Sequence, residues 1–516
     1  MYMKSPSEIL VYLKQNMKRE WKIAFISTFL IGVLLHAPMM IRDIPNHDGL
    51  DSMHFSQNMI MSGRWFLSVA CGLTSYYTLP WLIGILAMVY LGLASVFMVD
   101  FLEVKDTLSI ILISSLLVSF PTLASTFAYV FTMDGYMMAV FLAVLAVWLT
   151  KKKSMGFVPG AVCLALSMAI YQAYLPVAVI LSIYGVLMIA MEKGDIKEKL
   201  LNMLHYLYMG FFGCVGYYVV LQIMLKIQST EIGTYQEGSS LGFLGGMSIL
   251  ECIKNIYVDF FAFTFNGNVL INNVFSATAI VGLGLVTLTT LIRLIAYTDW
   301  WKSFWFYMIV ILLVVGLPIA TNIMLLVLPG VTYHLLMRYQ WILFPVLMIA
   351  FVSKYNKGLL GDRRREWIIV LCALELAWNF VVTDHIAYSN LQKKYEKTYA
   401  YCVRLLDRIE QTEGYYTGMP IAMIGVVGDE PYPATDITGA VTDHLIGMNG
   451  DWLLYTGNNY ELFMEHYLGA SLNILPPDSM EEMYYDERYR EMESFPAQDS
   501  IRIMDGVMYI KTENKE

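Results

Sequence analysis

The sequence predicts an α-helical polytopic membrane protein of about eleven transmembrane helices, followed by a small extracytoplasmic α/β domain. The 516 residues are 57% hydrophobic and only 15% charged, whereas about a quarter of the residues of a soluble domain are charged. The apolar residues also come in blocks of roughly 20, the length that crosses the hydrocarbon core of a bilayer. After residue 388 these blocks stop and the pattern of a soluble domain begins.

The apolar blocks give eleven expected spans with short loops between them. Lysine and arginine gather on alternate loops, which places those loops in the cytoplasm of a multi-pass plasma or inner membrane protein. Segment 1–21 is then a cytoplasmic amphipathic helix, and the bundle, 22–388, has outer loops at 42–79 and 226–267. The expected spans are 22–41, 80–99, 107–125, 128–150, 155–174, 176–192, 203–225, 268–296, 303–328, 332–352 and 366–385.

The final segment, 389–516, has the pattern of an extracytoplasmic α/β domain. "YEKTYAYCVRLLDRIEQ" is typical of an amphipathic helix, and "PIAMIGVV" of a buried strand. "SIRIMDGVMYIKT" predicts two strands joined by an Asp-Gly turn, a strong hairpin signal. The stretch "GVVGDEP" lacks the spacing of a dinucleotide-binding loop.

Composition also excludes some functions. The net charge is −9, the last segment carries most of the acidic excess, and no basic patch interleaved with aromatics suggests nucleic-acid binding. The six cysteines form no CxxC pair, so a zinc site or redox motif is not expected.

The first outer loop reads "IRDIPNHDGLDSMHFSQNMIMSGRW" and carries two aspartates, Asp48 and Asp51. His47, Asp51, His54 and Asn58 recur at helical spacing, which predicts a short amphipathic helix on the membrane surface. Two carboxylates on one face would supply a general base and a partner that orients the acceptor. The alternatives are a solvated acidic loop, or a divalent metal held by Asp48 and Asp51.

Two basic positions suit a phosphate group. Arg64 and Trp65 end the first-loop motif, and a guanidinium binds phosphate through a planar fork. His334 and Arg338, in "TYHLLMRYQW", are four residues apart on one expected helix face. The alternatives are an interfacial anchor for Trp65 and contact with ordinary anionic lipids for the basic pair.

The remaining polar residues at the outer ends of spans suit a sugar. Asp134 lies inside or near the outer end of the fourth span. An acid inside a membrane is costly and indicates a functional residue; the alternative is an acid at a helix end at the depth of the lipid headgroups. Tyr171 and Gln172 lie in "YQAYLP", and Tyr339 follows Arg338. Such side chains hydrogen-bond sugar hydroxyls or form a membrane belt.

All of these groups are expected on the outer side. Acids that activate an acceptor hydroxyl, together with cations that hold a phosphate leaving group, suit glycosyl transfer from a lipid-linked sugar phosphate.

"NHDGLDSMHFSQNMIMSGRW", "YQAYLP" and "MRYQW" together resemble the Gtr-type (type II) polytopic glucosyltransferases, of the GT-C class, over roughly residues 20–390. The resemblance implies transfer of a sugar from a polyprenyl phosphate to a cell-surface polysaccharide, with inversion and a first-loop aspartate as general base. Carried over, Asp48 is the first choice for the base and Asp51 the second, and Arg64 and Arg338 are candidates for the donor phosphate. Family members often have two adjacent acids where this chain has "DG".

Two other functions stay open at this point. One is a transporter or flippase for a lipid-linked sugar, and the other is a GT-C glycan ligase that uses a diphosphate-linked oligosaccharide. The expected partners are the lipid-linked donor, a surface glycan and the bilayer. No cofactor is assigned beyond the possible metal at Asp48 and Asp51.

Overall fold

The computed structural model of the chain divides into two compact units. Unit 1 comprises residues 1–41 and 56–384, and unit 2 comprises 42–55 and 385–516. The structure describes residues 5–8, 17–45, 47–51, 53–153, 155–192, 194–233, 248–266, 274–298, 304–327, 333–356, 362–424, 454 and 457–512. Most of the expected N-terminal amphipathic helix and the stretch "GVVGDEP" therefore lie outside the described residues.

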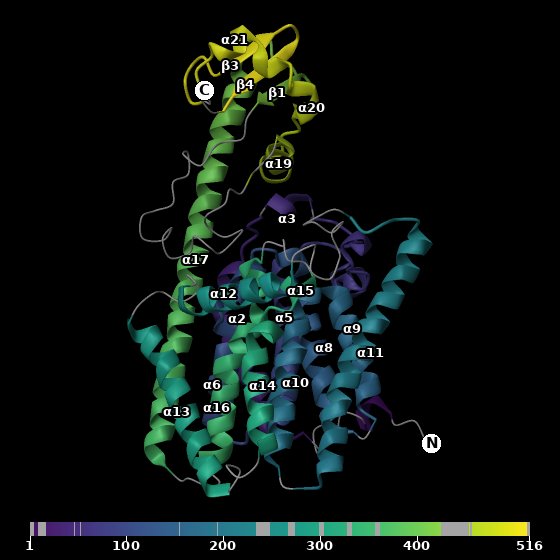
Figure 1. The fold of residues 1–516 in the computed structure, drawn as a ribbon. Helices are drawn as coiled ribbons and strands as arrows, with labels where there is room; N and C mark the ends of the chain where they lie inside the picture. Colours follow the sequence, from purple (N-terminus) through teal and green to yellow (C-terminus); the bar gives the residue numbers. More distant parts are fainter. Residues whose placement is uncertain are drawn as a thin grey trace. The chain divides into compact units, whose positions relative to one another are not determined.

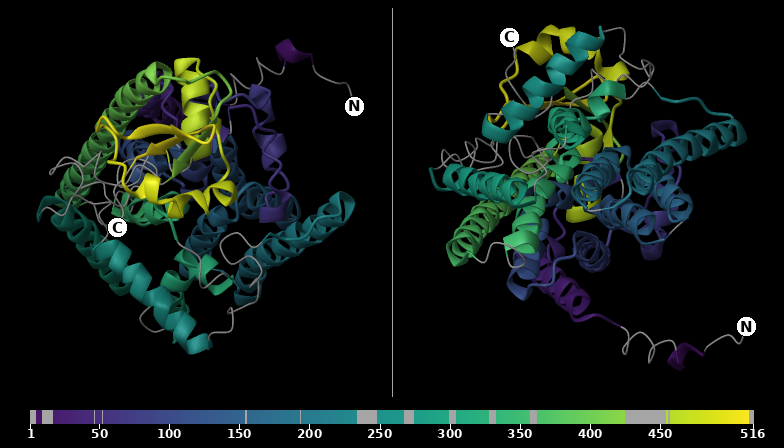
Figure 2. Two further views of the ribbon diagram at one scale, coloured as in Figure 1. Left: turned by 90° about the horizontal axis from the view of Figure 1, so that it is seen from above. Right: turned by 60° about the horizontal axis from the view of Figure 1, so that its bottom comes forward.

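Unit 1 is a bundle of apolar helices (Figure 1), which Figure 2 shows end-on. Helix α2 packs on α5 and α6, α8 packs on α5 and α9, and α9 packs on α11. The helices are α2 (Arg19–Met40), α5 (Pro80–Leu102), α6 (Thr107–Ser119), α7 (Pro121–Phe127), α8 (Met133–Lys152), α9 (Phe157–Ile170), α10 (Leu175–Met191), α11 (Ile196–Gln228), α12 (Ile249–Asn266), α13 (Val274–Thr298), α14 (Phe304–Thr321), α15 (Met324–Val327) and α16 (Leu343–Tyr355). Helix α17 (Arg363–Gln411) begins in unit 1 and continues into unit 2.

Among the described residues, seven helices are long and apolar enough to cross a membrane, or eight if the bent pair α6–α7 is one span. Each expected span falls on a helix, but the number eleven is not confirmed, because three of the apolar helices have fewer than 18 residues. Two breaks have clear local causes. Phe120 is extended before Pro121, where the helical conformation is disfavoured, and α6 and α7 meet at 43°. Tyr171 is likewise extended and ends α9.

The two expected outer loops contain helices and turns among the described residues. In the first loop, the expected helix from His47 to Asn58 is shorter in the structure: α3 comprises His47–Asp51, and His54 lies in no helix. The turns after it are short: Ile60–Ser62, Leu67–Ala70 and Gly72–Thr74. In the segment 226–267, helix α12 begins at Ile249, and residues 234–247 lie outside the described residues.

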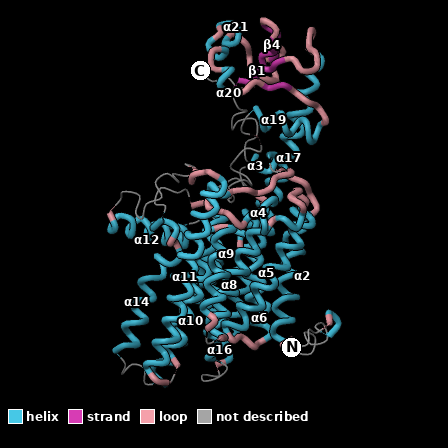
Figure 3. Tube along the Cα trace, turned by 90° about the vertical axis from the view of Figure 1, so that its right-hand side faces the viewer, coloured by secondary structure: helices cyan, strands magenta, loops and turns pink. Residues whose placement is uncertain are grey.

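Unit 2 contains a four-stranded sheet, and Figure 3 shows its strands in magenta. The strand order is β2-β1-β4-β3, in which β1 (Pro420–Ile424) pairs in parallel with β2 (Asn473–Ile474) and β4 (Val507–Lys511). Strand β3 (Ile501–Met504) pairs antiparallel with β4, and Asp505 and Gly506 between them both have positive φ. The predicted Asp-Gly hairpin is confirmed. Strand β1 covers the first five residues of the expected strand "PIAMIGVV", and the last three lie outside the described residues.

The short helices of unit 2 pack on this sheet and on the first-loop segment. The expected helix "YEKTYAYCVRLLDRIEQ" is not separate, because it forms the last part of α17. Helix α19 (Gly457–Phe463) packs on α3, so the first-loop segment Arg42–Phe55 belongs to this unit. Two short helices, α20 (Pro477–Met480) and α21 (Glu487–Arg490), complete it. The sheet packs through a core that includes Ala422, Met480, Tyr489, Met492, Met504 and Tyr509.

Candidate functional site

The motif "SGRW" forms a locked turn in unit 1. Gly63 has a φ of 75°, a conformation that favours glycine. The side-chain amide of Gln172 donates to the carbonyl oxygen of Ser62 at 3.0 Å, and the Tyr217 hydroxyl donates to that of Gly63 at 3.0 Å. The backbone N–H of Phe66 donates to Ala169 O at 2.9 Å. Two motifs from distant parts of the sequence, "SGRW" and "YQAYLP", are therefore joined by a hydrogen bond.

This turn places Arg64 among tyrosines. Its guanidinium lies over the Tyr171 ring, 4.5 Å from the centroid, and donates to the Tyr136 hydroxyl at 3.3 Å. Tyr136 and Tyr171 are stacked, with centroids 4.5 Å apart. Trp65 packs beside Ile60, Leu221 and Leu225, and its buried indole N–H has no hydrogen-bond partner among the described residues. The turn therefore holds the Arg64 guanidinium against two stacked tyrosine rings.

Asp134 lies in the first turn of α8, two residues before Tyr136. Only 1% of the residue is exposed, and its Oδ1 accepts the backbone N–H of Gly135 at 2.8 Å. Its Oδ2 is buried without a hydrogen-bond partner among the described residues. This burial disfavours the alternative of a solvated helix end.

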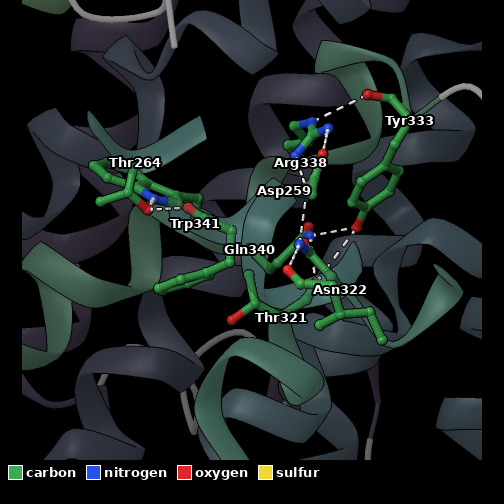
Figure 4. A network of polar contacts seen from close by, with 10 residues as sticks. Asp259, Thr264, Thr321, Asn322, Tyr333, Arg338, Gln340 and Trp341 are labelled. Atoms are coloured by element: carbon green, nitrogen blue, oxygen red, sulfur yellow. Dashed lines mark hydrogen bonds and ion pairs between the residues drawn. The ribbon is translucent and has the colours of Figure 1, made fainter. Parts of the chain in front are cut away.

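Arg338 belongs to a second cluster of unit 1, built around α12 (Figure 4). Its guanidinium makes two hydrogen bonds to the Asp259 carboxylate, at 2.7 and 2.8 Å, and its Nε donates to Tyr333 O at 3.0 Å. The rings of Phe263 and Tyr333 lie 4.6 and 4.4 Å from it. Only 12% of the Arg338 side chain is exposed. The sequence predicts that Arg338 binds a phosphate, whereas in the structure its bidentate partner is the Asp259 carboxylate.

Neighbouring amides and hydroxyls extend the Arg338 cluster. Asn322 donates to Asp259 at 2.7 Å, and Gln340 donates to the Tyr333 hydroxyl at 2.7 Å. The indole of Trp341 donates to Thr264 at 3.1 Å. Tyr339 is almost wholly buried and its hydroxyl donates to Leu117 O at 2.8 Å, so it serves the packing of the bundle in this structure. His334 is half-buried and precedes the turn Leu335–Met337.

The predicted catalytic aspartates lie in unit 2. Asp48 is exposed in the first turn of α3, whereas the side chains of Asp51 and His47 lie outside the described residues. A neighbouring acid, Asp43, accepts a hydrogen bond from the Tyr467 hydroxyl at 3.3 Å. Tyr467 is itself stacked on Phe463 at 4.9 Å. The α3 segment therefore rests on an aromatic support supplied by the C-terminal part of the chain.

The structure adds residues that the sequence did not single out, chiefly Asp259, Asn322 and Asp43. Asp259 lies in the segment 226–267, which the sequence predicts to be a loop, and its partner Arg338 is 79 residues away. Among the described residues, no group of three or more His, Cys, Asp or Glu side chains is placed to hold a metal ion.

Gly63→Ala should destabilise the protein by at least about 1 kcal/mol, because alanine is strained at positive φ. Its Cβ would also lie 2.5 Å from both Gln172 Nε2 and the Tyr217 hydroxyl. Thermal unfolding in detergent measures the effect. Gly210→Ala on α11 is the matched control, because nothing lies within 4 Å of its Cβ. Equal unfolding temperatures for the two variants would contradict the locked turn.

Asp43→Asn should stabilise the protein at neutral pH. Burial raises the pKa of Asp43 above its usual value of 3.8, although the Tyr467 hydrogen bond acts in the opposite direction. A raised pKa means that folding favours the protonated acid, so its contribution to stability is full below pH 3.8 and is lost as pH rises through the folded-state pKa. Unfolding curves at several pH values should therefore differ between variant and wild type at pH 7 and converge in acid. A less stable variant at pH 7 would refute this.

The comparisons with known proteins agree with these motifs. No curated protein and no solved structure shows a significant match to the chain. The family described as Glucosyl transferase GtrII matches residues 37–353. This range includes Asp48, Arg64, Asp134, Gln172 and Arg338. Because the match covers more than half of the 516 residues, the chain belongs to the GtrII glucosyl transferase family.

Proposed function

We propose that the protein is an inverting glycosyltransferase that moves glucose from a polyprenyl phosphate to a cell-surface polysaccharide on the outer face of the membrane. Family membership supports glucosyl transfer and the apolar helices support a membrane protein. The observation that carries the proposal of a phosphate-linked donor is the Arg64 cluster. There the Arg64 guanidinium lies over the Tyr171 ring and donates to the Tyr136 hydroxyl, and the next residue, Trp65, has a buried indole N–H with no acceptor among the described residues.

The donor chemistry follows from these groups. When the bond between the anomeric carbon and the phosphate oxygen breaks, negative charge develops on the leaving phosphate. A guanidinium stabilises this charge and keeps its own proton. Arg64 is the first choice for this role, and Arg338 and His334 are the second. Trp65 and Tyr171 are proposed to contact the sugar through their rings, of which Tyr171 would first have to leave its contact with Arg64 or Tyr136. Asp134, Gln172 and Tyr339 are proposed sugar or acceptor contacts, of which Tyr339 would first have to leave its bond to Leu117.

The acceptor chemistry is assigned to Asp48. Its carboxylate takes the proton of the acceptor hydroxyl, and the oxygen attacks the anomeric carbon from the side opposite the phosphate, which inverts its configuration. The exposure of Asp48 supports this role, because a large glycan can reach an exposed carboxylate. Asp51 is the second choice for the base.

Transfer by the purified full-length protein tests the proposal. Radiolabelled glucose is offered on polyprenyl phosphate, on a diphosphate-linked carrier or as a nucleotide sugar, each with a surface glycan. The proposal expects label in the glycan from polyprenyl phosphate alone. Transfer only from the diphosphate carrier would replace it with the ligase function. Passage of the lipid across a vesicle membrane without a new glycosidic bond would replace it with the flippase. The same assay with a chelator added tests for a metal ion, and loss of transfer in the presence of the chelator would point to Asp48 and Asp51 as its ligands.

A further inference from the structure

A polar cavity of about 170 Å³ lies in unit 1 between α8, α10 and α11. It is far from the Arg64 cluster, because Lys151 in its wall is in the last turn of α8 and Tyr136 is in the first. These three helices lie side by side in the bundle (Figure 1). The polar residues of the wall are Thr150, Lys151, Tyr184, Glu192, Asn202, His205 and Tyr206.

The wall contains a hydroxyl whose hydrogen-bonding capacity is not used. Tyr184 is 7% exposed, and its hydroxyl has no hydrogen-bond partner among the described residues. A buried polar group without a partner is costly, so such groups usually meet a ligand or water. The second tyrosine, Tyr206, approaches α10 closely because residue 185 is glycine, where a Cβ would lie 2.7 Å from its hydroxyl. Both tyrosines line the cavity, and the Tyr184 hydroxyl is available to an acceptor there.

Cations offset the negative helix ends around the cavity. Lys151 donates to Phe101 O, at the end of α5, and to Glu103, both at 2.8 Å. Lys199 donates to the carbonyl oxygens of Glu192 and Ala190 at the end of α10. Carbonyl groups at helix C-termini carry partial negative charge, and these ammonium groups neutralise it. These contacts reduce the negative charge that an anion in the cavity would meet.

Hydrogen-bond donors predominate in the wall. His205 is held by stacking on Phe157 at 5.3 Å, and Asn202 lies one turn before it on α11. Glu192 is the one carboxylate that lines the cavity among the described residues, and it is exposed. Donors from lysine, histidine, amide and two tyrosines suit a group with several acceptor oxygens, such as a phosphate.

We propose that this cavity binds the phosphate of a lipid headgroup. The volume accommodates a phosphate but not the whole lipid. Exposed residues of α11 offer the apolar surface that acyl chains need, because Leu201 and Leu207 are 52% and 66% exposed. Basic pockets between transmembrane helices bind lipid headgroups in the same way. This site is separate from the proposed glycosyl transfer and does not depend on it.

Native mass spectrometry of delipidated full-length protein, titrated with phosphatidylglycerol, tests the proposal. Tyr184→Phe removes a hydroxyl that makes no internal bond among the described residues, so it should weaken lipid binding by about tenfold without lowering the unfolding temperature of the lipid-free protein. Glu192→Gln should strengthen binding by roughly threefold or more, because a like charge is removed. Glu198→Gln, exposed in the first turn of α11 and outside the cavity wall, should change nothing.

The same titration contains the outcomes that overturn the proposal. Unchanged binding in Tyr184→Phe would show that the hydroxyl does not meet the lipid. Weaker binding in Glu192→Gln would show that the cavity takes a cation. Equal binding of diacylglycerol, which has no phosphate, would remove the phosphate contact. Displacement of the lipid by millimolar inorganic phosphate would assign the cavity to free phosphate, whereas retention of the lipid supports the headgroup.

Discussion

Asp48→Asn should lower the rate of glycan glucosylation by about 10²–10⁴-fold, the usual contribution of a general base. Asparagine keeps the shape of the side chain but does not accept the proton of the acceptor hydroxyl. Asp48 is exposed on α3, so the variant should unfold at the wild-type temperature and bind the lipid-linked donor with unchanged affinity. Initial rates at saturating donor and acceptor, together with unfolding curves, measure these quantities.

Two controls make this result specific. Glu465→Gln neutralises another exposed acid of unit 2 and should leave the rate unchanged. Asp51→Asn tests the second candidate for the base, so a large loss in that variant and none in Asp48→Asn would exchange the two roles. Normal glucosylation by both aspartate variants would remove the first loop from the proton transfer altogether.

The second large effect is expected at the ion pair between Asp259 and Arg338. Asp259→Asn leaves a largely buried guanidinium without its carboxylate, and breaking such a pair costs about 3 kcal/mol of stability. Arg338→Gln should cost a similar amount, and the double variant should cost less than the sum of the two, because the residues act as one unit. Glu251→Gln, exposed in the first turn of the same helix, is the matched control.

Kinetics separates the structural role of Arg338 from a role in donor binding. If Arg338 also holds the donor phosphate, Arg338→Gln should raise the KM for the donor by about tenfold, because a charge-assisted hydrogen bond is lost. Asp259→Asn should not raise it, because the guanidinium remains. An unchanged KM in both variants would make the pair purely structural and leave the phosphate to Arg64.

Local patterns predicted the local structure well. The Asp-Gly turn between β3 and β4 was predictable because both residues accept positive φ, and β1 lies in the apolar run "PIAMIGVV" that predicted it. The number of spans was less predictable. Hydropathy does not show the break at Phe120 and Pro121 or the extended residue Tyr171, since neither interrupts the apolar run.

The partners within the candidate site were not predictable, because they come from distant parts of the sequence. Gln172 reaches the carbonyl oxygen of Ser62 over 110 residues, and Arg338 reaches Asp259 over 79. The sequence identified Arg338 by its chemistry but gave no sign that a carboxylate binds it. It also gave no sign that the segment around Asp48 folds with the C-terminal unit, a grouping that tertiary contact alone produces.

The central claim is that the chain breaks a sugar–phosphate bond of a lipid and makes a glycosidic bond. The most direct measurement is the balance of products in vesicles that contain the purified protein, polyprenyl-phosphate-linked [¹⁴C]glucose and a surface glycan. The account predicts that each labelled glucose added to the glycan releases one polyprenyl phosphate, with the opposite anomeric configuration in the product. Label that crosses the membrane while still attached to its lipid, with no labelled glycan and no free polyprenyl phosphate, would contradict it.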